Sequence, residues 1–321
     1  VILQDQYDLS PLVEAIHLRD SLEQVAYQGT VNLVVTPDMP PISPGMAIRI
    51  SGIPYGKKDY VPLLHPAVVW EVETSNNGVK RMTLTLYDRT VYLDKSEDEY
   101  LFPAKQTATQ RFKKYAADWN LKIAVLPDTE KQLGRSVYRT QSIYASMFAD
   151  LRETAKAGGK LYHPRMISSG LELYELGTNR DVYILEALTD TTQSRTLEGA
   201  ATKVKVLATA ASETGQEVPS KVMAIEEKDI AKYGQLQAII QDDEVKSPAA
   251  ARQLARNKLR GIRETISLNA PDINTIRAGD AVMLGSMRLL VISVSRELGS
   301  PGNMMLELGS YDDVKRRFYL E

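Results

Sequence analysis

Short segments in which apolar and polar residues alternate dominate the N-terminal third of the chain. Such alternation predicts β-strands, because successive side chains of a strand point to opposite faces of a sheet. The pattern occupies residues 28–35, 46–50, 68–73 and 82–87. The dipeptide Asn77-Gly78 separates the last two segments and favours a tight hairpin, since both residues tolerate positive φ. These segments predict a small antiparallel β-domain.

The period changes to that of a helix after an acidic stretch at residues 94–99, which we interpret as a solvated linker. One predicted helix places Phe112, Tyr115, Ala116 and Trp119 on one face, and a second does the same for Ile143, Met147 and Leu151. The second helix should end at Gly158-Gly159, because glycine readily adopts the left-handed conformation of a C-cap. Strands are predicted at 121–126, 160–162, 171–174 and 182–185. This order predicts a compact α/β domain.

Strands return after residue 189, at 204–207, 222–225 and 265–268, with one helix among them at about residues 248–261. Ser247 is suited to cap that helix and Pro248 to begin it, since the first turn needs no proline N–H. The inner stripe consists of Ala251, Leu254, Ala255, Leu259 and Ile262, and the outer side carries Arg252, Arg256, Arg260 and Arg263. The charged residues 312–321 should be irregular or helical.

Two parts of the chain share one order: a turn glycine, a strand, an apolar strand, a hairpin, a strand and a Tyr-Asp pair. The order predicts a duplication in which Gly45 corresponds to Gly279 and Trp70 to Ile292. The Tyr-Asp pair at residues 87–88 (Tyr87, Asp88) should correspond to the pair at 311–312 (Tyr311, Asp312). The alternative is coincidence, because unrelated antiparallel domains also share alternation and turn glycines.

The predicted fold class is therefore mainly β with an α+β part. Two related small antiparallel β-barrel domains, at residues 1–104 and 189–321, flank an inserted α/β domain at residues 105–188. The second barrel domain includes the helix near residues 248–261.

Composition excludes several classes of function. The chain has 39 basic and 41 acidic residues, a balance that does not indicate a sequence-specific nucleic-acid binder. Cysteine is absent, which excludes disulfides, thiolate nucleophiles and cysteine-bound zinc. Apolar runs are too short to cross a membrane, and the first residues do not resemble a signal peptide. We therefore expect synthesis in the cytoplasm and no membrane partner.

Candidate catalytic and metal-binding residues are few. The three histidines, His17, His65 and His163, have no second histidine at ligand spacing, so we assign them structural or solvent-exposed roles. The chain also lacks the Gly-x-Ser-x-Gly elbow of serine hydrolases. We therefore predict no catalytic residues, no metal site and no cofactor.

Three further motifs have ordinary explanations. The loop at residues 52–58 is one residue short of a phosphate-binding loop and lacks its Ser or Thr, so we interpret it as a connection between strands. The acidic runs at 97–99 and 242–244 are interpreted as solvated linkers rather than a glycosidase pair or a calcium loop. The arginine stripe is interpreted as a wet helix face, with contact to an acidic neighbouring subunit as the alternative.

Three segments carry a family resemblance: Leu9 to Glu14, Tyr87 to Leu93, and Lys232 to Gly234. In this order and spacing the chain resembles the XkdQ/YqbQ family of PBSX-like prophages, which are similar to baseplate hub proteins of contractile tails. The resemblance implies two duplicated barrels, an inserted α/β domain, a homotrimer and no catalytic residues. The loop at residues 53–66 is longer than the resemblance implies.

From the resemblance we expect a structural hub in the virion tail or baseplate, synthesised in the bacterial host. The hub would act as a symmetry adaptor between a sixfold tail tube protein and a threefold central spike protein, with a LysM-type tail protein and other baseplate proteins as neighbours. Two alternatives remain open: a tail-associated cell-wall hydrolase and a carbohydrate-binding tail module. The second would need exposed aromatic platforms, whereas Trp70 and Trp119 both lie in core-like patterns.

Overall fold

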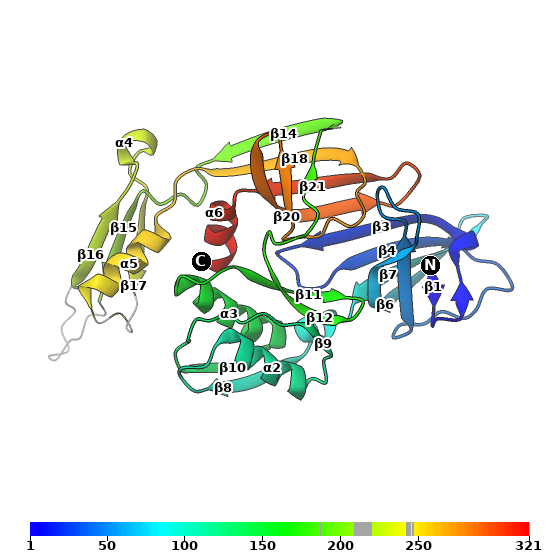
Figure 1. Ribbon diagram of the computed structural model, residues 1–321, viewed down its shortest axis with the longest axis horizontal. Helices are drawn as coiled ribbons and strands as arrows, with labels where there is room; N and C mark the ends of the chain where they lie inside the picture. The colour runs from blue at the N-terminus through cyan, green and yellow to red at the C-terminus, as the bar shows by residue number, and fades with distance from the viewer. Residues whose placement is uncertain (187, 209–219, 242–244, 246, 321) are drawn as a thin grey trace. The chain divides into compact units, whose positions relative to one another are not determined.

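The computed structural model describes residues 1–186, 188–208, 220–241, 245 and 247–320 (Figure 1). This part of the chain is mainly β, as predicted. It divides into two compact units. The first contains residues 1–192 and 266–314, and the second contains the described residues of 193–265 and those from 315 onward.

A long sheet of thirteen strands is the main feature of the fold. Its strands are β1 (Ile2–Leu3), β2 (Tyr7–Asp8), β3 (Val13–Ser21), β4 (Gln28–Val34), β5 (Ala47–Gly52), β6 (Val61–Asn76), β7 (Lys80–Asp88), β13 (Tyr183–Ile184), β14 (Asp190–Thr196), β18 (Arg263–Pro271), β19 (Ala281–Leu284), β20 (Met287–Glu297) and β21 (Asn303–Gly309). Neighbouring strands follow the order β14-β18-β21-β20-β3-β4-β7-β6-β5-β1-β2, and β19 pairs with β20 and β13. The 3-10 helix η1 (Ser10–Leu12) precedes β3.

The predicted closed barrels are not found among the described residues. Strand β20 pairs with β3, with Ser293 opposite Ser21 and Glu297 opposite His17, so strands from both predicted barrel domains share one open sheet. Figure 1 shows the orange β20 beside the blue β3. The alternation in the sequence identified strands correctly, but it does not determine which edges pair, and here β3 pairs with a strand from the far end of the chain.

Two halves of this sheet have the same strand order. We call β5-β6-β7-β4-β3 the first half and β19-β20-β21-β18-β14 the second half. The amide of Gly45 donates to the carbonyl of Val69, and that of Gly279 to the carbonyl of Val291, both over 2.8 Å. The residue after each of these carbonyls, Trp70 in β6 and Ile292 in β20, lies at a register shift of its strand. Gly45 is thus equivalent to Gly279, and Trp70 to Ile292, as predicted.

The predicted equivalence of the two Tyr-Asp pairs is wrong by two residues. Leu86 lies opposite Val69, and Leu308 lies opposite Val291. Tyr87 therefore matches Gly309, and Asp88 matches the residue after it. The register of backbone pairing decides the match, whereas the sequence comparison was attracted to identical side chains.

Each half buries its own apolar face. In the first half the core contains Leu18, Val31, Ile50 and Leu84. The second half buries Leu268, Val282, Val294 and Leu306 in an equivalent way. Burial of alternate residues removes apolar surface from water at roughly 25 cal/mol per Å² and fixes the register, because a slip of one residue would expose the core side chains.

The segment between the two halves contains short helices and small sheets. Its elements are α1 (Val91–Lys95), β8 (Glu97–Phe102), α2 (Ala108–Asp118), β9 (Ile123–Val125), β10 (Ser136–Ser142), α3 (Ile143–Lys156), β11 (Tyr162–Ile167) and β12 (Gly170–Glu175). Strands β8 and β10 pair, and β12 pairs with both β11 and β9. The predicted helices are present, although Trp119 lies just beyond the end of α2.

The acidic run at 97–99 is not a linker, contrary to our interpretation. It begins β8, whose next residues Tyr100 and Phe102 are buried. Their rings contact Tyr115 of α2 at centroid distances of 4.6 and 5.3 Å. Burial of these two aromatic side chains draws the charged residues before them into the strand.

The second unit has its own small core. Its elements are β15 (Lys203–Leu207), β16 (Val222–Glu227), α4 (Ile230–Tyr233), β17 (Gln237–Gln241), α5 (Pro248–Lys258) and the π-helix η2 (Lys315–Tyr319). The sheet order is β16-β15-β17, and Val204 and Val206 form a buried cluster with Ala251 and Ala255 of α5. The helix α6 (Tyr311–Val314) precedes η2 in the chain. Among the described residues, no helix is long and apolar enough to cross a membrane.

Helix α5 is shorter than predicted. Ser247 caps it, since the Ser247 hydroxyl accepts a hydrogen bond from the Ala250 amide, and Pro248 begins it. The helix ends at Lys258, so only Arg252 and Arg256 of the predicted arginine stripe lie on it. Arg260 follows the helix and forms backbone hydrogen bonds with Ala201, which end the helical pattern.

Candidate functional site

The face of the long sheet opposite its cores carries mostly short polar side chains. It arises from the same alternation, because residues between the buried ones point to the other face. Ser295 lies opposite Arg19 across the pairing of β20 with β3, so this surface continues from one half to the other. We call it the polar face. It contains His17, Arg19, Gln28, Thr30, Asn32, Thr83, Thr85, Ser267, Asn269, Ser293, Ser295 and Glu307.

The polar face contains hydrogen-bonded side chains and open hollows. The Thr83 hydroxyl donates to the Asn32 side chain over 3.1 Å. One hollow, over β3, β20, β21 and β18, is lined by Arg19, Ser267 and Glu307 among others. Within the described part of the chain, no three His, Asp or Glu side chains are close enough together to hold a metal ion.

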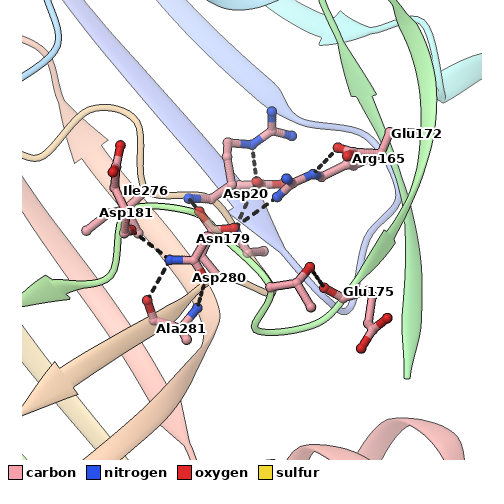
Figure 2. A network of polar contacts seen from close by, with 12 residues as sticks. Asp20, Arg165, Glu172, Glu175, Asn179, Asp181, Ile276, Asp280 and Ala281 are labelled. Atoms are coloured by element: carbon pink, nitrogen blue, oxygen red, sulfur yellow. Dashed lines mark hydrogen bonds and ion pairs between the residues drawn. The ribbon is translucent and has the colours of Figure 1, made fainter. Parts of the chain in front are cut away.

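A buried polar network joins the β11–β12 hairpin to the long sheet (Figure 2). The Arg165 guanidinium donates to Glu172 over 2.8 Å and to Asp280 over 3.0 Å. The second carboxylate oxygen of Asp280 accepts from the Arg277 amide over 2.9 Å. The side chain of Arg277 forms an ion pair with Asp20 of β3. The network therefore connects β3, β11, β12 and the residues before β19.

The side-chain amide of Asn179 extends this connection, because it forms hydrogen bonds with the backbone of β19 as a neighbouring strand would. Its side-chain oxygen accepts from the Ala281 amide over 2.6 Å, and its side-chain nitrogen donates to the Ala281 carbonyl over 2.9 Å. Strand β13 then pairs in parallel with β19, with Tyr183 opposite Val282. Met46 takes the place of Asp280 in the first half, so the first half has no carboxylate at the position that receives Arg165 in the second half.

Burial and nearby charges shift the pKa values of three groups in and beside the network. Burial by itself raises the pKa of Asp20, but the Arg277 guanidinium outweighs burial and holds the pKa below its usual value. Burial raises the pKa of Asp88 to about 6, against hydrogen bonds from Thr90. Burial lowers the pKa of His163 to about 4, and its Nδ1 atom has no hydrogen-bond partner.

The three histidines do not come together. His17 is exposed on the polar face, whereas His65 lies in β6 and His163 is buried in β11. His65 and His163 each precede a proline, which is typical of a loop, yet both lie in strands. Each strand accepts the proline where its missing N–H is not needed for pairing.

The other motifs singled out in the sequence have simple positions. Residues 52–58 connect β5 with β6, as interpreted. Arg256 forms an ion pair with Glu226 over 3.2 Å within its own unit. The acidic run at 242–244 lies outside the described residues.

The assignment of Trp70 to a core was wrong. It is 37% exposed, and its ring makes edge contacts with Tyr87 and Tyr92 at centroid distances of 6.0 and 6.1 Å. Trp70 lies at the register shift of β6, between Val69 and Glu71. This shift interrupts the alternation of inward and outward side chains along the strand. Trp119 donates to the Tyr100 hydroxyl over 3.0 Å and is partly buried.

Sequence reasoning missed the buried network. Asp20 follows Leu18 at the interval of a buried strand position, and a charged residue there was the available signal. Its partners are isolated residues more than a hundred positions away, so no spacing in the sequence links them.

Solved structures with the same fold include phage tail proteins. The chain is similar to a 43 kDa tail protein of prophage MuSo2 from Shewanella oneidensis, with 12% identity, a TM-score of 0.70, and 94% of this chain and 98% of the other covered. A tail protein from Neisseria meningitidis gives 12% identity, a TM-score of 0.66, and coverage of 96% and 94%. A type VI secretion component from E. coli, itself structurally similar to the T4 tail proteins gp27 and gp5, gives 10% identity, a TM-score of 0.52, and coverage of 93% and 73%.

Curated proteins give no match to the chain. A family model does match, over residues 19–293, which include most of both sheet halves and the segment between them. The chain therefore belongs to the YQBQ-like family.

Proposed function

We propose that the chain is a non-enzymatic structural subunit of a phage-like contractile tail, and that it forms the hub of the baseplate. Membership of the YQBQ-like family and a fold shared with prophage tail proteins support this role. The likeness to a secretion component that is itself similar to gp27 and gp5 supports a position next to a spike.

The single observation that carries the proposal is the equivalence of the two sheet halves. Gly45 and Gly279 make the same backbone hydrogen bond, and Trp70 and Ile292 lie at the same register shift. Three chains contain six such halves. A ring of three can then present six similar elements to a sixfold tube protein while remaining threefold for a central spike protein. We therefore propose a homotrimer that acts as a symmetry adaptor.

The polar face supports a ring with an open centre. When sheets join edge to edge into a ring, one face must point inward. The face that carries both apolar cores is already covered by other parts of the chain. The polar face is therefore the one that would point into the ring. Short polar side chains there would let the passing cargo slide without strong adhesion. The same proposal places the chain in the virion tail or baseplate, after synthesis in the bacterial host, with a LysM-type tail protein among its neighbours.

Reconstruction of the purified particle tests the proposal. We expect three copies of the chain at the junction between tube and spike, with their six sheet halves at one radius. A hub with one copy or six copies would overturn the adaptor model. Degradation of peptidoglycan by the purified chain, absent from a buffer control, would overturn its non-enzymatic part.

A further inference from the structure

The two halves of the long sheet meet at one junction, where β20 pairs with β3. The equivalent strand edges at the other ends of the two halves could form a second junction of the same kind. In the junction within the chain, residues 293–297 of β20 pair antiparallel with residues 17–21 of β3. The equivalent edges are residues 71–76 of β6 and strand β14. Among the described residues, that part of β6 pairs only with β7, and β14 only with β18. Nearly all side chains of these two segments are exposed.

Burial differs between the two junctions in a matched way. The amide of Leu22, the first residue after β3, donates to the carbonyl of Ile292 over 2.9 Å. Both side chains are 2% exposed. The first residue after β14 is Leu197, which is 41% exposed, and Trp70, the equivalent of Ile292, is 37% exposed. The apolar residues that are covered in the filled junction are thus uncovered in the open one.

The side chains at the open junction are larger than those at the equivalent positions of the filled junction. A Cβ atom on Gly309 would lie 2.9 Å from Ile292 Cδ1, so this position leaves no room for a side chain. Tyr87 occupies the place of Gly309 in the first half and contacts Trp70. Tyr92 of α1 completes the group and is 42% exposed. Aromatic side chains with a polar tip, beside a free strand edge, are typical of protein–protein contacts.

We propose that the outer edge of β6, residues 71–76, pairs antiparallel with β14 of a second copy of this chain. In that junction Trp70, Tyr87 and Tyr92 pack against Leu197 of the second copy. The occupant follows from the chain itself, since the β20–β3 junction is a template for the same two edges. Backbone hydrogen bonds supply the pairing, and burial of Trp70 and Leu197 adds apolar contact. The inference rests on the proposed ring and names the residues that close it.

Engineered cysteines test the junction in assembled particles, because the natural chain has none. Glu73→Cys is combined in turn with a cysteine at each position from Thr191 to Arg195. The particles are purified under reducing conditions, oxidised and separated without reductant. Pairing predicts dimers and trimers linked by disulfides, with yields that peak at alternate positions along β14. The pair Arg19→Cys and Ser295→Cys is the positive control, since it should close within one chain.

A second set of variants tests the apolar contact. Leu197→Lys should lower incorporation of the chain into particles at least tenfold, whereas Leu101→Lys, at another exposed leucine, should leave it unchanged. Binding of a glycan to the Trp70 group in intact particles would assign that group to another partner and overturn its place in the junction.

The outcomes separate this inference from the proposed function. Absence of cross-links above the single-cysteine background, in particles whose reconstruction has three copies at the hub, overturns the β6–β14 junction and leaves the hub standing. Particles with a different copy number overturn both.

Discussion

Gly45 and Gly279 occupy the same position in the two sheet halves and adopt the same left-handed backbone, with φ of +92° and +87°. Their surroundings differ. A Cβ atom on Gly45 would meet nothing within 4 Å, whereas one on Gly279 would lie 2.7 Å from Leu176 Cδ2 and 3.5 Å from the Tyr174 ring. Leu176 and Tyr174 therefore pack closely against Gly279, and no side chain packs against Gly45 in this way.

Alanine at these two positions should therefore have unequal effects. Gly45→Ala costs only the backbone strain of positive φ, about 1 kcal/mol of unfolding free energy. Gly279→Ala adds displacement of the buried Leu176 side chain, and we expect a total loss of about 2–4 kcal/mol. Urea unfolding of both variants measures the difference. Equal losses would contradict the close approach at Gly279.

Arg111 and Asp150 form a buried ion pair between α2 and α3. Both side chains are almost completely buried, and their closest atoms are 2.6 Å apart. The hydroxyls of Tyr115 and Tyr138 also donate to Asp150. Arg111→Met should leave the carboxylate buried without its cation and lower the unfolding free energy by about 3–5 kcal/mol.

The matched control is Lys114→Met, three residues along the same helix, which removes an exposed ion pair with Asp118. Exposed pairs contribute little, so this variant should lose less than about 1 kcal/mol. Similar losses in the two variants would show that Asp150 finds other compensation.

The sequence predicted the elements of this fold better than their arrangement. Alternation located the strands of both halves, and the resemblance to the XkdQ/YqbQ family is confirmed by the YQBQ-like match. The pairing of β20 with β3 could not be predicted, because both strands carry the same alternation as their other neighbours. The domain boundaries at residues 104 and 188 stay a prediction.

Trp70 shows why the exposed residues were harder to predict. Its apolar neighbours in the sequence favoured a core position, but a register shift turns its side chain to the surface. The absence of catalytic residues also stays a prediction, since it concerns chemistry and not fold.

The N-caps of α2 and α3 offer a further matched pair. The Thr107 hydroxyl accepts from the Gln110 amide, and the Gln110 side chain accepts in return from the Thr107 amide over 3.0 Å. Ser142 accepts from the Ala145 amide, and alanine has no side-chain oxygen with which to return the bond. Thr107→Ala should cost about 1–2 kcal/mol and Ser142→Ala about 1 kcal/mol, because the first variant loses a reciprocal pair. Thermal unfolding of the two variants checks the order, and a larger loss at Ser142 would contradict it.

His163 should make stability depend on pH. Burial lowers its pKa to about 4 from an unfolded value of 6.5, and the charges facing it are those of Asp20, Arg165 and Arg277. Between these two pKa values the unfolded chain binds a proton at this residue that the folded chain does not. Its contribution to stability is therefore complete above pH 6.5 and falls as the pH is lowered to about 4, by on the order of 3 kcal/mol.

Comparison with a variant isolates this effect. Asp88 acts in the opposite direction over nearly the same range, because its raised pKa of about 6 makes the folded chain gain stability as the pH falls toward 4. His163→Leu removes one titration and leaves the other, so the variant should become more stable relative to the natural chain as the pH falls from 6.5 to 4. Urea midpoints measured across this range provide the test. Two parallel curves would mean that His163 does not bind a proton on unfolding in this range.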